Sequence, residues 1–267
     1  MLKSAVFKPI AAISFLMLAN AAQVCAFTCD AGYRFSFGKT VDGTLIDFAY
    51  SGARGPEHWA SLAPKGKWAM CDEGERQAPI AISPRGAIAA QIGIDFHYSQ
   101  DIHFVDHSDA LGADHGGGNY IVIDGTRYDL IQIHYHQPAE TILNGHTYPL
   151  ELHLVHRSAA GVLAVVGVFI EKGRADKGIL SLPGNPRLAA EPVIIKASSL
   201  LPARRSFFRF NGSLTTPGCD QPVLFNVMEH PIQMSSEQIA AFACGIENSA
   251  RPVQKLNRRF VLYGAKP

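Results

Sequence analysis

Short apolar runs separated by turn residues predict a chain built mainly of β-strands. From residue 80 onward, stretches rich in Val, Ile, Tyr and Phe recur between Gly, Pro, Asn and Asp residues, a pattern typical of strands. The almost unbroken apolar run Val162–Ile170 predicts a strand that is buried on both faces. The expected strands are Ile92–Tyr98, Ile102–Asp106, Tyr120–Ile123, Arg127–His136, Leu150–His156 and Leu163–Glu171.

Signals for helices are few. Ser235–Cys244 begins with a serine cap, has an acidic residue early and is followed by Gly245, which predicts a short helix. Arg174–Leu182 is a second candidate, for one helical turn. Residues Phe27 to Gly55 are polar and weakly patterned, so we expect an N-terminal arm with little regular structure, and Asp109–Gly118 is expected to be a loop.

Two neighbouring expected strands carry histidines in a spacing that suggests a metal site. His134 and His136 are two residues apart, so their side chains share one face of a strand. His153 lies in the next strand, and Asn144-Gly145 between them is a strong hairpin turn signal. Three imidazoles with an open fourth position are the ligand set of a catalytic zinc ion.

Further polar residues lie on the same faces as these histidines. Gln132 is two residues before His134, and Glu151 is two residues before His153. Metal-bound histidines usually donate their other ring N–H to such groups, so both are expected to orient a ligand. His156 is out of phase with His153 and is interpreted as structural.

A threonine pair near Cys219 gains interest beside such a site. Gly212–Cys219 contains Ser-Leu-Thr-Thr-Pro, which by itself is ordinary turn chemistry. A Thr215 hydroxyl can accept a hydrogen bond from a metal-bound hydroxide only if its own proton goes to another acceptor. Glu140 is the natural candidate.

Composition limits the class of protein. The chain has 267 residues, a formal net charge of +1 and 47% hydrophobic residues, enough for one large domain or two small ones with a substantial core. Neither the net charge nor its distribution suggests a nucleic-acid partner.

The N-terminus predicts export. Lys3 and Lys8 precede the apolar run Ile10–Ala22, which resembles a signal peptide and is too short for a confident membrane span. We favour cleavage after Ala26, so that 1–26 is the signal peptide; cleavage after Ala21 is the alternative. A periplasmic or secreted location follows.

Cysteine parity agrees with export. Cleavage after Ala26 would remove Cys25 and leave four cysteines, which permit two disulfides in three connectivities.

Several motifs in one order resemble the α-class carbonic anhydrases of the exported bacterial type. The resemblance runs from about Tyr50 to Leu262, and it implies a single domain over 27–267 with a central twisted, mostly antiparallel sheet and a few short peripheral helices. The matching stretches include Gly55–Trp59, Gly74–Gln77, Leu130–His136, Glu151–His156, Ser213–Pro217, Ser235–Gln238 and Arg251-Pro252.

The resemblance also implies an activity and a role for each matching residue. The activity is reversible hydration of carbon dioxide to bicarbonate and a proton by attack of a zinc-bound hydroxide. The implied roles are zinc ligation by His134, His136 and His153; orientation of the hydroxide by Thr215, whose proton Glu140 accepts; support of the ligands by Gln132 and Glu151; a carbon dioxide pocket of Val155, Val165, Leu214 and Val223; bicarbonate binding by Thr216; and a disulfide between Cys71 and Cys219. A bridge between Cys29 and Cys244 is suggested only by parity.

The chain departs from the family pattern around the site. Asn119 stands where fast members carry a histidine that shuttles protons, and an amide cannot do so; His115 or His107, in a longer loop than usual, is the candidate substitute. Gln137 and Phe225 stand where tryptophan is common. These differences bear on rate more than on activity.

Two other readings remain open at this level. The spacing of His134, His136 and Glu140 also resembles a cupin site for iron or manganese, but His153 lies in an apolar strand rather than in a Gly/Pro-rich motif. Some carbonic anhydrase relatives are binding modules, and these typically lose a zinc histidine, whereas this chain keeps all three. The sequence leaves the oligomeric state open, and a homodimer is compatible with it.

Overall fold

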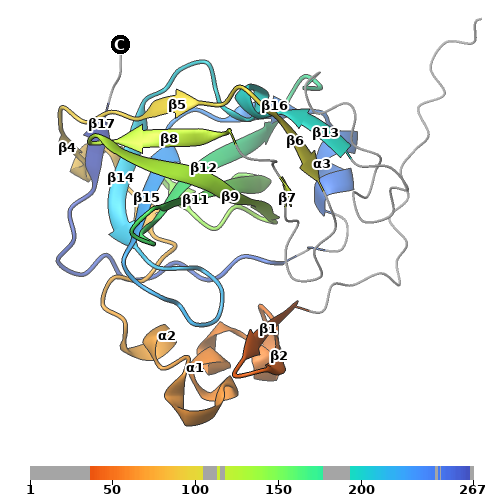
Figure 1. The fold of residues 1–267 in the computed structure, drawn as a ribbon, viewed down its shortest axis with the longest axis vertical. Helices are drawn as coiled ribbons and strands as arrows, with labels where there is room; N and C mark the ends of the chain where they lie inside the picture. Colours follow the sequence, from red (N-terminus) through yellow and green to blue (C-terminus); the bar gives the residue numbers. More distant parts are fainter. Residues whose placement is uncertain are drawn as a thin grey trace, which may run out of the picture.

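The computed structural model describes residues 37–104, 113–114, 118–176, 193–243, 246 and 248–264. Within this part of the chain, one large curved sheet dominates the fold (Figure 1). In spatial order its strands are β4 (Ile88–Ala89), β17 (Leu262–Gly264), β14 (Phe207–Gly212), β15 (Val223–Met228), β12 (Leu163–Lys172), β11 (Leu150–Ser158), β9 (Thr126–His136), β8 (Tyr120–Ile123) and β5 (Asp95–His97), with β16 (Ile232–Met234) also paired to β12.

Most neighbours in this sheet are antiparallel. The parallel pairs are β12 with β15, β12 with β16, and β17 with β4. Two of these three pairs are made by β12, which lies in the interior of the sheet. The prediction of a mainly antiparallel β fold is therefore confirmed.

Smaller elements surround the sheet. The two-stranded pairs are β1 (Phe37–Val41) with β2 (Thr44–Phe48) and β3 (Ala81–Ile82) with β10 (Ile142–Leu143), and a three-stranded sheet joins β13 (Val193–Lys196), β6 (Asp101–Phe104) and β7 (Ala113–Asp114). The helices are α1 (Trp59–Leu62), α2 (Met70–Glu73) and α3 (Ser236–Ala243), with the 3-10 turns η1 (Gly52–Arg54), η2 (Pro56–His58), η3 (Pro64–Gly66), η4 (Pro84–Gly86) and η5 (Ala197–Leu200).

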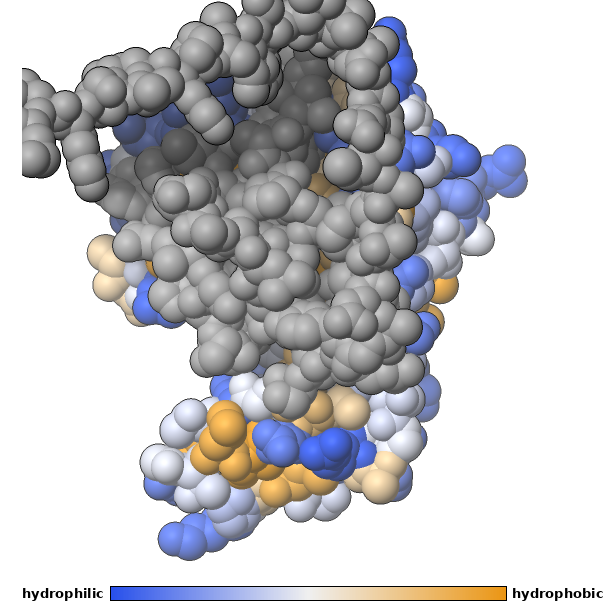
Figure 2. Space-filling model, turned by 90° about the vertical axis from the view of Figure 1, so that its right-hand side faces the viewer, coloured by the Kyte–Doolittle hydropathy of each residue, from blue (hydrophilic) through white to orange (hydrophobic). Residues whose placement is uncertain are grey.

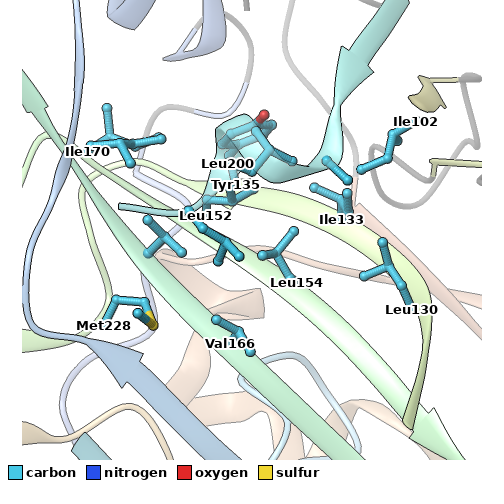
Figure 3. Packing of buried hydrophobic residues seen from close by; sticks show 14 of the residues in the cluster. Ile102, Leu130, Ile133, Tyr135, Leu152, Leu154, Val166, Ile170, Leu200 and Met228 are labelled. Carbon is cyan, nitrogen blue, oxygen red and sulfur yellow. The ribbon is translucent and has the colours of Figure 1, made fainter. Parts of the chain in front are cut away.

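The largest apolar cluster covers one face of the central strands. Figure 3 shows Ile133 of β9, Leu152 and Leu154 of β11 and Val166 of β12 packed together, and all four are fully buried. Burying an aliphatic side chain of this size stabilises the fold by about 1.5–3 kcal/mol. The opposite face of the same strands carries a second cluster, which includes Val165. Strand β12 is thus buried on both faces, as its continuous apolar run predicts.

Residues 37–73 form an N-terminal lobe below the large sheet (Figure 1). Its interior is aromatic: the rings of Phe48 and Trp59 are 5.7 Å apart, and the Trp59 indole donates to the Ala49 carbonyl oxygen at 2.9 Å. Figure 2 shows the lobe from another side, with apolar and hydrophilic side chains both on its surface. Leu45 is its most exposed large apolar residue, at 66%.

The expectation of an irregular N-terminal arm is wrong for residues 37–48. Strands β1 and β2 form a regular antiparallel hairpin in which Phe37 pairs with Phe48. Asp42 and Gly43 turn the chain with φ angles of 48° and 80°, a combination typical of a two-residue hairpin turn. The Asp-Gly pair between alternating apolar residues was the sequence signal for this hairpin.

The other local predictions fare differently. Helix α3 is present, and its start is a capping box in which the Gln238 N–H donates to Ser235 Oγ while the Ser235 N–H donates to Gln238 Oε1. Arg174–Asp176 is not helical, so that prediction is wrong for its described part.

The remaining predictions fall on parts of the chain that the structure leaves undescribed. These are the signal peptide 1–26, Cys29, Cys244, His107, His115 and most of the Asp109–Gly118 loop. Within that loop Ala113–Asp114 forms strand β7, which pairs with β6, so the expectation of a loop is wrong at these two residues.

Candidate metal centre

Three histidines meet because β9 and β11 pair in a particular register. His153 lies directly opposite His134, and His136 on the same face lies opposite Glu151. The three ring centroids are 4.8–5.2 Å apart. One nitrogen from each ring lies within 4.8 Å of the others, an arrangement that can hold a metal ion. The two-residue spacing and the hairpin pairing together produce this cluster.

The second nitrogen of two of these rings has a defined neighbour. His136 Nδ1–H donates to the Ser249 carbonyl oxygen at 2.7 Å, which leaves Nε2 for the cluster. His153 Nε2 lies 3.2 Å from Glu151 Oε1, which leaves Nδ1 for the cluster. Such contacts fix the tautomer and orientation of a metal-binding imidazole.

His134 differs from the other two rings. Its Nδ1 is buried, and among the described residues it has no hydrogen-bond partner. Gln132, expected to support this ring, lines the cavity beside it instead. The structure therefore supplies the expected neighbour for His153, a backbone carbonyl for His136, and no such contact for His134.

Burial favours the neutral form of His134 and His136. Burial lowers the pKa of His134 well below its usual value, and the neighbouring imidazoles lower it further. Burial also lowers the pKa of His136, an effect that the Ser249 carbonyl partly offsets. Neutral imidazole is the form that binds a metal, so the state favoured at these two rings suits a cation.

Unsatisfied atoms inside the cluster provide a test of whether a cation fits. His136 Nε2 and Glu140 Oε2 are both buried, lack hydrogen-bond partners among the described residues, and lie 3.3 Å apart. Two acceptors at this distance are unfavourable unless a proton or a cation lies nearby. The donor set of three imidazoles is that of zinc, and a zinc ion would satisfy Nε2, so the residues present fit such an ion.

Glu140 is buried beside the histidines. Its Oε1 accepts a hydrogen bond from the Arg251 backbone N–H at 2.8 Å. Burial raises the pKa of the Glu140 carboxyl to about 7, while His153, the Arg251 N–H and the Thr215 hydroxyl act in the opposite direction. Thr215 thus lies near enough to influence the Glu140 carboxyl although the two are 75 residues apart in sequence, and its orienting role stays a prediction.

Glu151 depends on a close approach that only glycine permits. Its Oε2 accepts from the Thr141 N–H at 2.7 Å, and the His153 interaction and this bond outweigh the effect of burial, so its pKa is lowered. Gly167 on β12 lies opposite His153, and a Cβ there would approach Glu151 Oε1 to 2.9 Å.

A disulfide and hydrogen bonds anchor the loop that carries Thr215. The loop consists of residues 213–222 and connects β14 to β15. A disulfide joins Cys219 in this loop to Cys71 in α2. Gln77 donates to the Cys219 carbonyl oxygen at 3.1 Å, and Arg251 donates to Gln77 Oε1 at 2.8 Å. These contacts anchor the loop that carries Thr215 to α2 and to the chain around Gln77 and Arg251.

A cavity of about 270 Å³ opens above the histidines. Val155, Val165 and Leu214, expected in the carbon dioxide pocket, line it, as do Thr215 and Thr216. Val223 is not among the lining residues; it is buried in the same apolar cluster as Val155 and Val165.

Some residues that line the cavity were given no pocket role by sequence reasoning. Phe225, noted in the sequence only as standing where tryptophan is common, lies two residues along β15 from Val223 and lines the cavity, 5.9 Å from the His153 ring. Tyr50, Phe37 and Lys39 from the N-terminal lobe also line it. The alternation of side chains along β15 could have identified Phe225 as a cavity residue. No local sequence pattern indicates that the N-terminal lobe packs beside the histidines.

Two further residues lie away from the cavity. Asn119 is 1% exposed, and its amide exchanges hydrogen bonds of 3.0 and 3.1 Å with the backbone of Gln100. His156 lies on the opposite face of the sheet, where its Nε2 is 2.6 Å from the Tyr98 hydroxyl. The prediction that His156 is structural is consistent with this position.

Comparisons with known proteins agree with this geometry. The family model described as eukaryotic-type carbonic anhydrase matches residues 54–265. The carbonic anhydrase of Nostoc sp. is 35% identical over 233 residues, which cover 81% of this chain and 86% of that protein. Among solved structures, the alpha-carbonic anhydrase from Thermovibrio ammonificans, in complex with the inhibitor sulfanilamide, is 36% identical with a TM-score of 0.73, over 81% of this chain and 99% of that one.

A solved structure that holds a different ligand shares the same fold. Dioscorin complexed with ascorbate is 27% identical with a TM-score of 0.74, over 82% of this chain and 98% of that chain. The family model covers most of the sequence, and relatives above 30% identity span nearly their whole length. The chain belongs to the α-type carbonic anhydrase family.

Proposed function

We propose that this protein catalyses the reversible hydration of carbon dioxide to bicarbonate and a proton, at a zinc ion held by His134, His136 and His153. The observation that carries the proposal is the convergence of three imidazoles, two of them buried and one half-buried, in a cavity with apolar sides. Family membership makes the cupin alternative untenable.

The residues around the histidines suit this reaction. A zinc ion bound there would lower the pKa of a bound water to about 7 and so supply a nucleophile at neutral pH. Thr215, with its proton directed to an ionised Glu140, can only accept a hydrogen bond, and this restricts the orientation of the attacking oxygen. The positive charge of a bound cation would favour the ionised form of Glu140 against the effect of burial.

The cavity wall suits the two forms of the substrate. Val155, Val165 and Phe225 offer an apolar side for carbon dioxide, which has no net dipole. Thr216 offers a hydroxyl and backbone groups beside them for bicarbonate, which is charged. A pocket with one apolar side and one polar side therefore suits both the neutral substrate and the charged product.

Proton export in this protein is proposed to depend on buffer or on a histidine other than the usual one. Asn119 carries no titratable group, and its amide is fully engaged by Gln100. His115 and His107 remain the candidate internal carriers, and both lie outside the described residues.

The setting of the protein is proposed to be extracytoplasmic. The disulfide between Cys71 and Cys219 supports export, because such bonds persist in oxidising compartments. Among the described residues, no helix has the length and apolar character needed to cross a membrane.

The test is stopped-flow carbon dioxide hydration on protein whose zinc content has been measured, at several buffer concentrations. We expect hydration far above the uncatalysed rate that falls at low buffer. Turnover that is independent of buffer would support His115 or His107 as the carrier. Full zinc occupancy without turnover would contradict the proposed reaction and favour a binding module.

A further inference from the structure

The β1–β2 hairpin (residues 37–48) lies before the part of the chain that matches the family model, yet it forms one side of the metal pocket. The family match begins at residue 54. Phe37, Gly38, Lys39 and Phe48 of the hairpin all line the cavity together with the three histidines. The cavity is therefore bounded partly by a segment that the family pattern does not specify.

An aromatic stack links the hairpin to the metal-facing rings. The Phe37 ring packs edge-on to Tyr50 at 5.1 Å and lies 5.6 Å from its cross-strand partner Phe48. Tyr50 in turn lies edge-on to His136 at 6.4 Å. Phe37 thus occupies space at the end of a short chain of rings that begins at the floor of the pocket.

Lys39 fixes the hairpin to the loop that carries Thr215. Its Nζ donates to the Pro217 carbonyl oxygen at 2.8 Å and lies 3.9 Å from Asp220 Oδ2. Gly218 adopts a φ of 98°, and a Cβ there would approach Lys39 Nζ to 2.9 Å. The loop therefore has a glycine at the point where the lysine makes contact.

A second lysine contacts the hairpin at its turn. There Lys67 Nζ is 3.3 Å from Asp42 Oδ1, and neither residue lines the cavity. The hairpin thus has one lysine contact at the pocket and another at its turn, besides the exposed pair of Arg54 and Asp47 at 3.5 Å. This arrangement provides a matched control.

We propose that the β1–β2 hairpin is a specificity element, a wall that limits the size of ligands able to reach the metal, with Phe37 filling the space and Lys39 holding the wall against the Thr215 loop. The inference rests on the proposed function, since it concerns ligands of that same site. Carbon dioxide and bicarbonate pass the wall, whereas a ligand with an extended aromatic body meets Phe37.

Two sulfonamides with the same metal-binding group but different length test the wall. Calorimetry on the zinc-loaded protein gives Kd for benzenesulfonamide and for biphenyl-4-sulfonamide, and their ratio cancels the affinity of the shared group. We expect Phe37→Ala to strengthen binding of the biphenyl ligand about tenfold relative to benzenesulfonamide, because the second ring of the ligand no longer overpacks against the Phe37 ring. Lys39→Met is expected to shift the ratio the same way by about threefold, because one exposed polar attachment is lost.

Two variants on the same hairpin serve as controls. Thr40→Ala removes an exposed side chain beside Lys39, and Lys67→Met removes the attachment at the turn. Both should leave the ratio unchanged. A thermal melt of each variant verifies that the protein is folded at the temperature of the titration.

The outcomes separate this inference from the proposed function. Zinc binding and normal benzenesulfonamide affinity with an unchanged ratio in both Phe37→Ala and Lys39→Met would overturn the wall alone. An equal shift in Lys67→Met would also overturn it, because loosening of the lobe in general would then explain the result. Absence of zinc or of benzenesulfonamide binding in the unsubstituted protein would overturn the proposed function and this inference together.

Discussion

Leu152 and His153 are neighbours in β11, but their side chains lie on opposite faces of the sheet. Leu152 is fully buried among the apolar side chains shown in Figure 3. His153 is nearly as buried, at 2%, yet it is surrounded by Glu151, Glu140 and two other imidazoles. One face stabilises the fold by removing apolar surface from water, whereas the other buries polar groups that are unfavourable there unless they are paired.

The comparison shows how the fold supports a site that is unfavourable by itself. The apolar face fixes the register of β9, β11 and β12, and this register places His153 opposite His134. A cation would then satisfy the atoms that remain without partners on the polar face. Substitutions on the apolar face should therefore lower the free energy of unfolding, whereas substitutions on the polar face should lower metal affinity or rate.

The largest effect is expected from His153→Ala. Loss of one of three imidazoles should reduce zinc affinity by more than the roughly 10- to 100-fold that loss of a supporting residue typically causes. The measurement is zinc content after dialysis against a weak chelator, with His156→Ala from the opposite face as the control. Full zinc occupancy in His153→Ala would show that the ligand assignment is wrong.

Removal of the disulfide should mainly affect stability. Cys71 and Cys219 are 148 residues apart, so the bond strongly restricts the unfolded chain. Replacing both by serine should lower the free energy of unfolding by on the order of 4 kcal/mol. Urea denaturation of the double variant measures this. An unchanged midpoint would indicate that the bond does not form in the native protein.

Leu152→Ala is the counterpart of His153→Ala on the apolar face. Truncation of a buried leucine typically lowers the free energy of unfolding by about 2–5 kcal/mol, through lost transfer energy and a residual cavity. Zinc content should stay complete at temperatures where the variant is folded. Zinc loss parallel to that of His153→Ala would mean that the two faces are not separable.

Thr215→Ala should affect rate while leaving the metal in place. If Thr215 orients the attacking oxygen, its loss should lower kcat/KM for hydration by about 100-fold with full zinc occupancy. Thr215→Ser, which keeps the hydroxyl, should restore most of the rate. Equal rates in Thr215→Ala and the unsubstituted protein would exclude the orienting role.

The smallest expected effect is the pH dependence of the free energy of unfolding in the metal-free protein. Because burial raises the pKa of Glu140 to about 7, the folded state binds its proton more tightly than the unfolded state does. This contribution to stability is present below pH 4.5 and is lost as the pH rises toward 7. The loss is on the order of 2 kcal/mol if water entering the open cavity reduces the effect of burial.

The histidines require a comparison with Glu140→Gln rather than a single pH curve. The lowered pKa of His134 acts with opposite sign, since the unfolded state then binds the proton more tightly and stability rises with pH. Urea denaturation in EDTA at pH 5 and pH 8 should show a larger loss at pH 8 for the unsubstituted protein than for Glu140→Gln. The same pH dependence in both proteins would contradict a raised pKa at Glu140.

The sequence by itself determined the local features of this protein. The spacing of His134 and His136 specifies a shared face because side chains alternate along any strand. The continuous apolar run of β12 and the capping box of α3 could be read from neighbouring residues. The Asp42-Gly43 turn was equally readable, although the hairpin around it was not predicted.

Only the tertiary structure decided which distant segments complete the site. The Ser249 carbonyl meets His136 across 113 residues, and a backbone carbonyl has no signature in the sequence. The parallel pairing of β12 with β15 brings Phe225 rather than Val223 to the cavity, and Lys39 meets Pro217 across 178 residues. These contacts depend on how the sheets and loops pack as a whole, because local periodicity specifies the face of a side chain but not its partner on another strand.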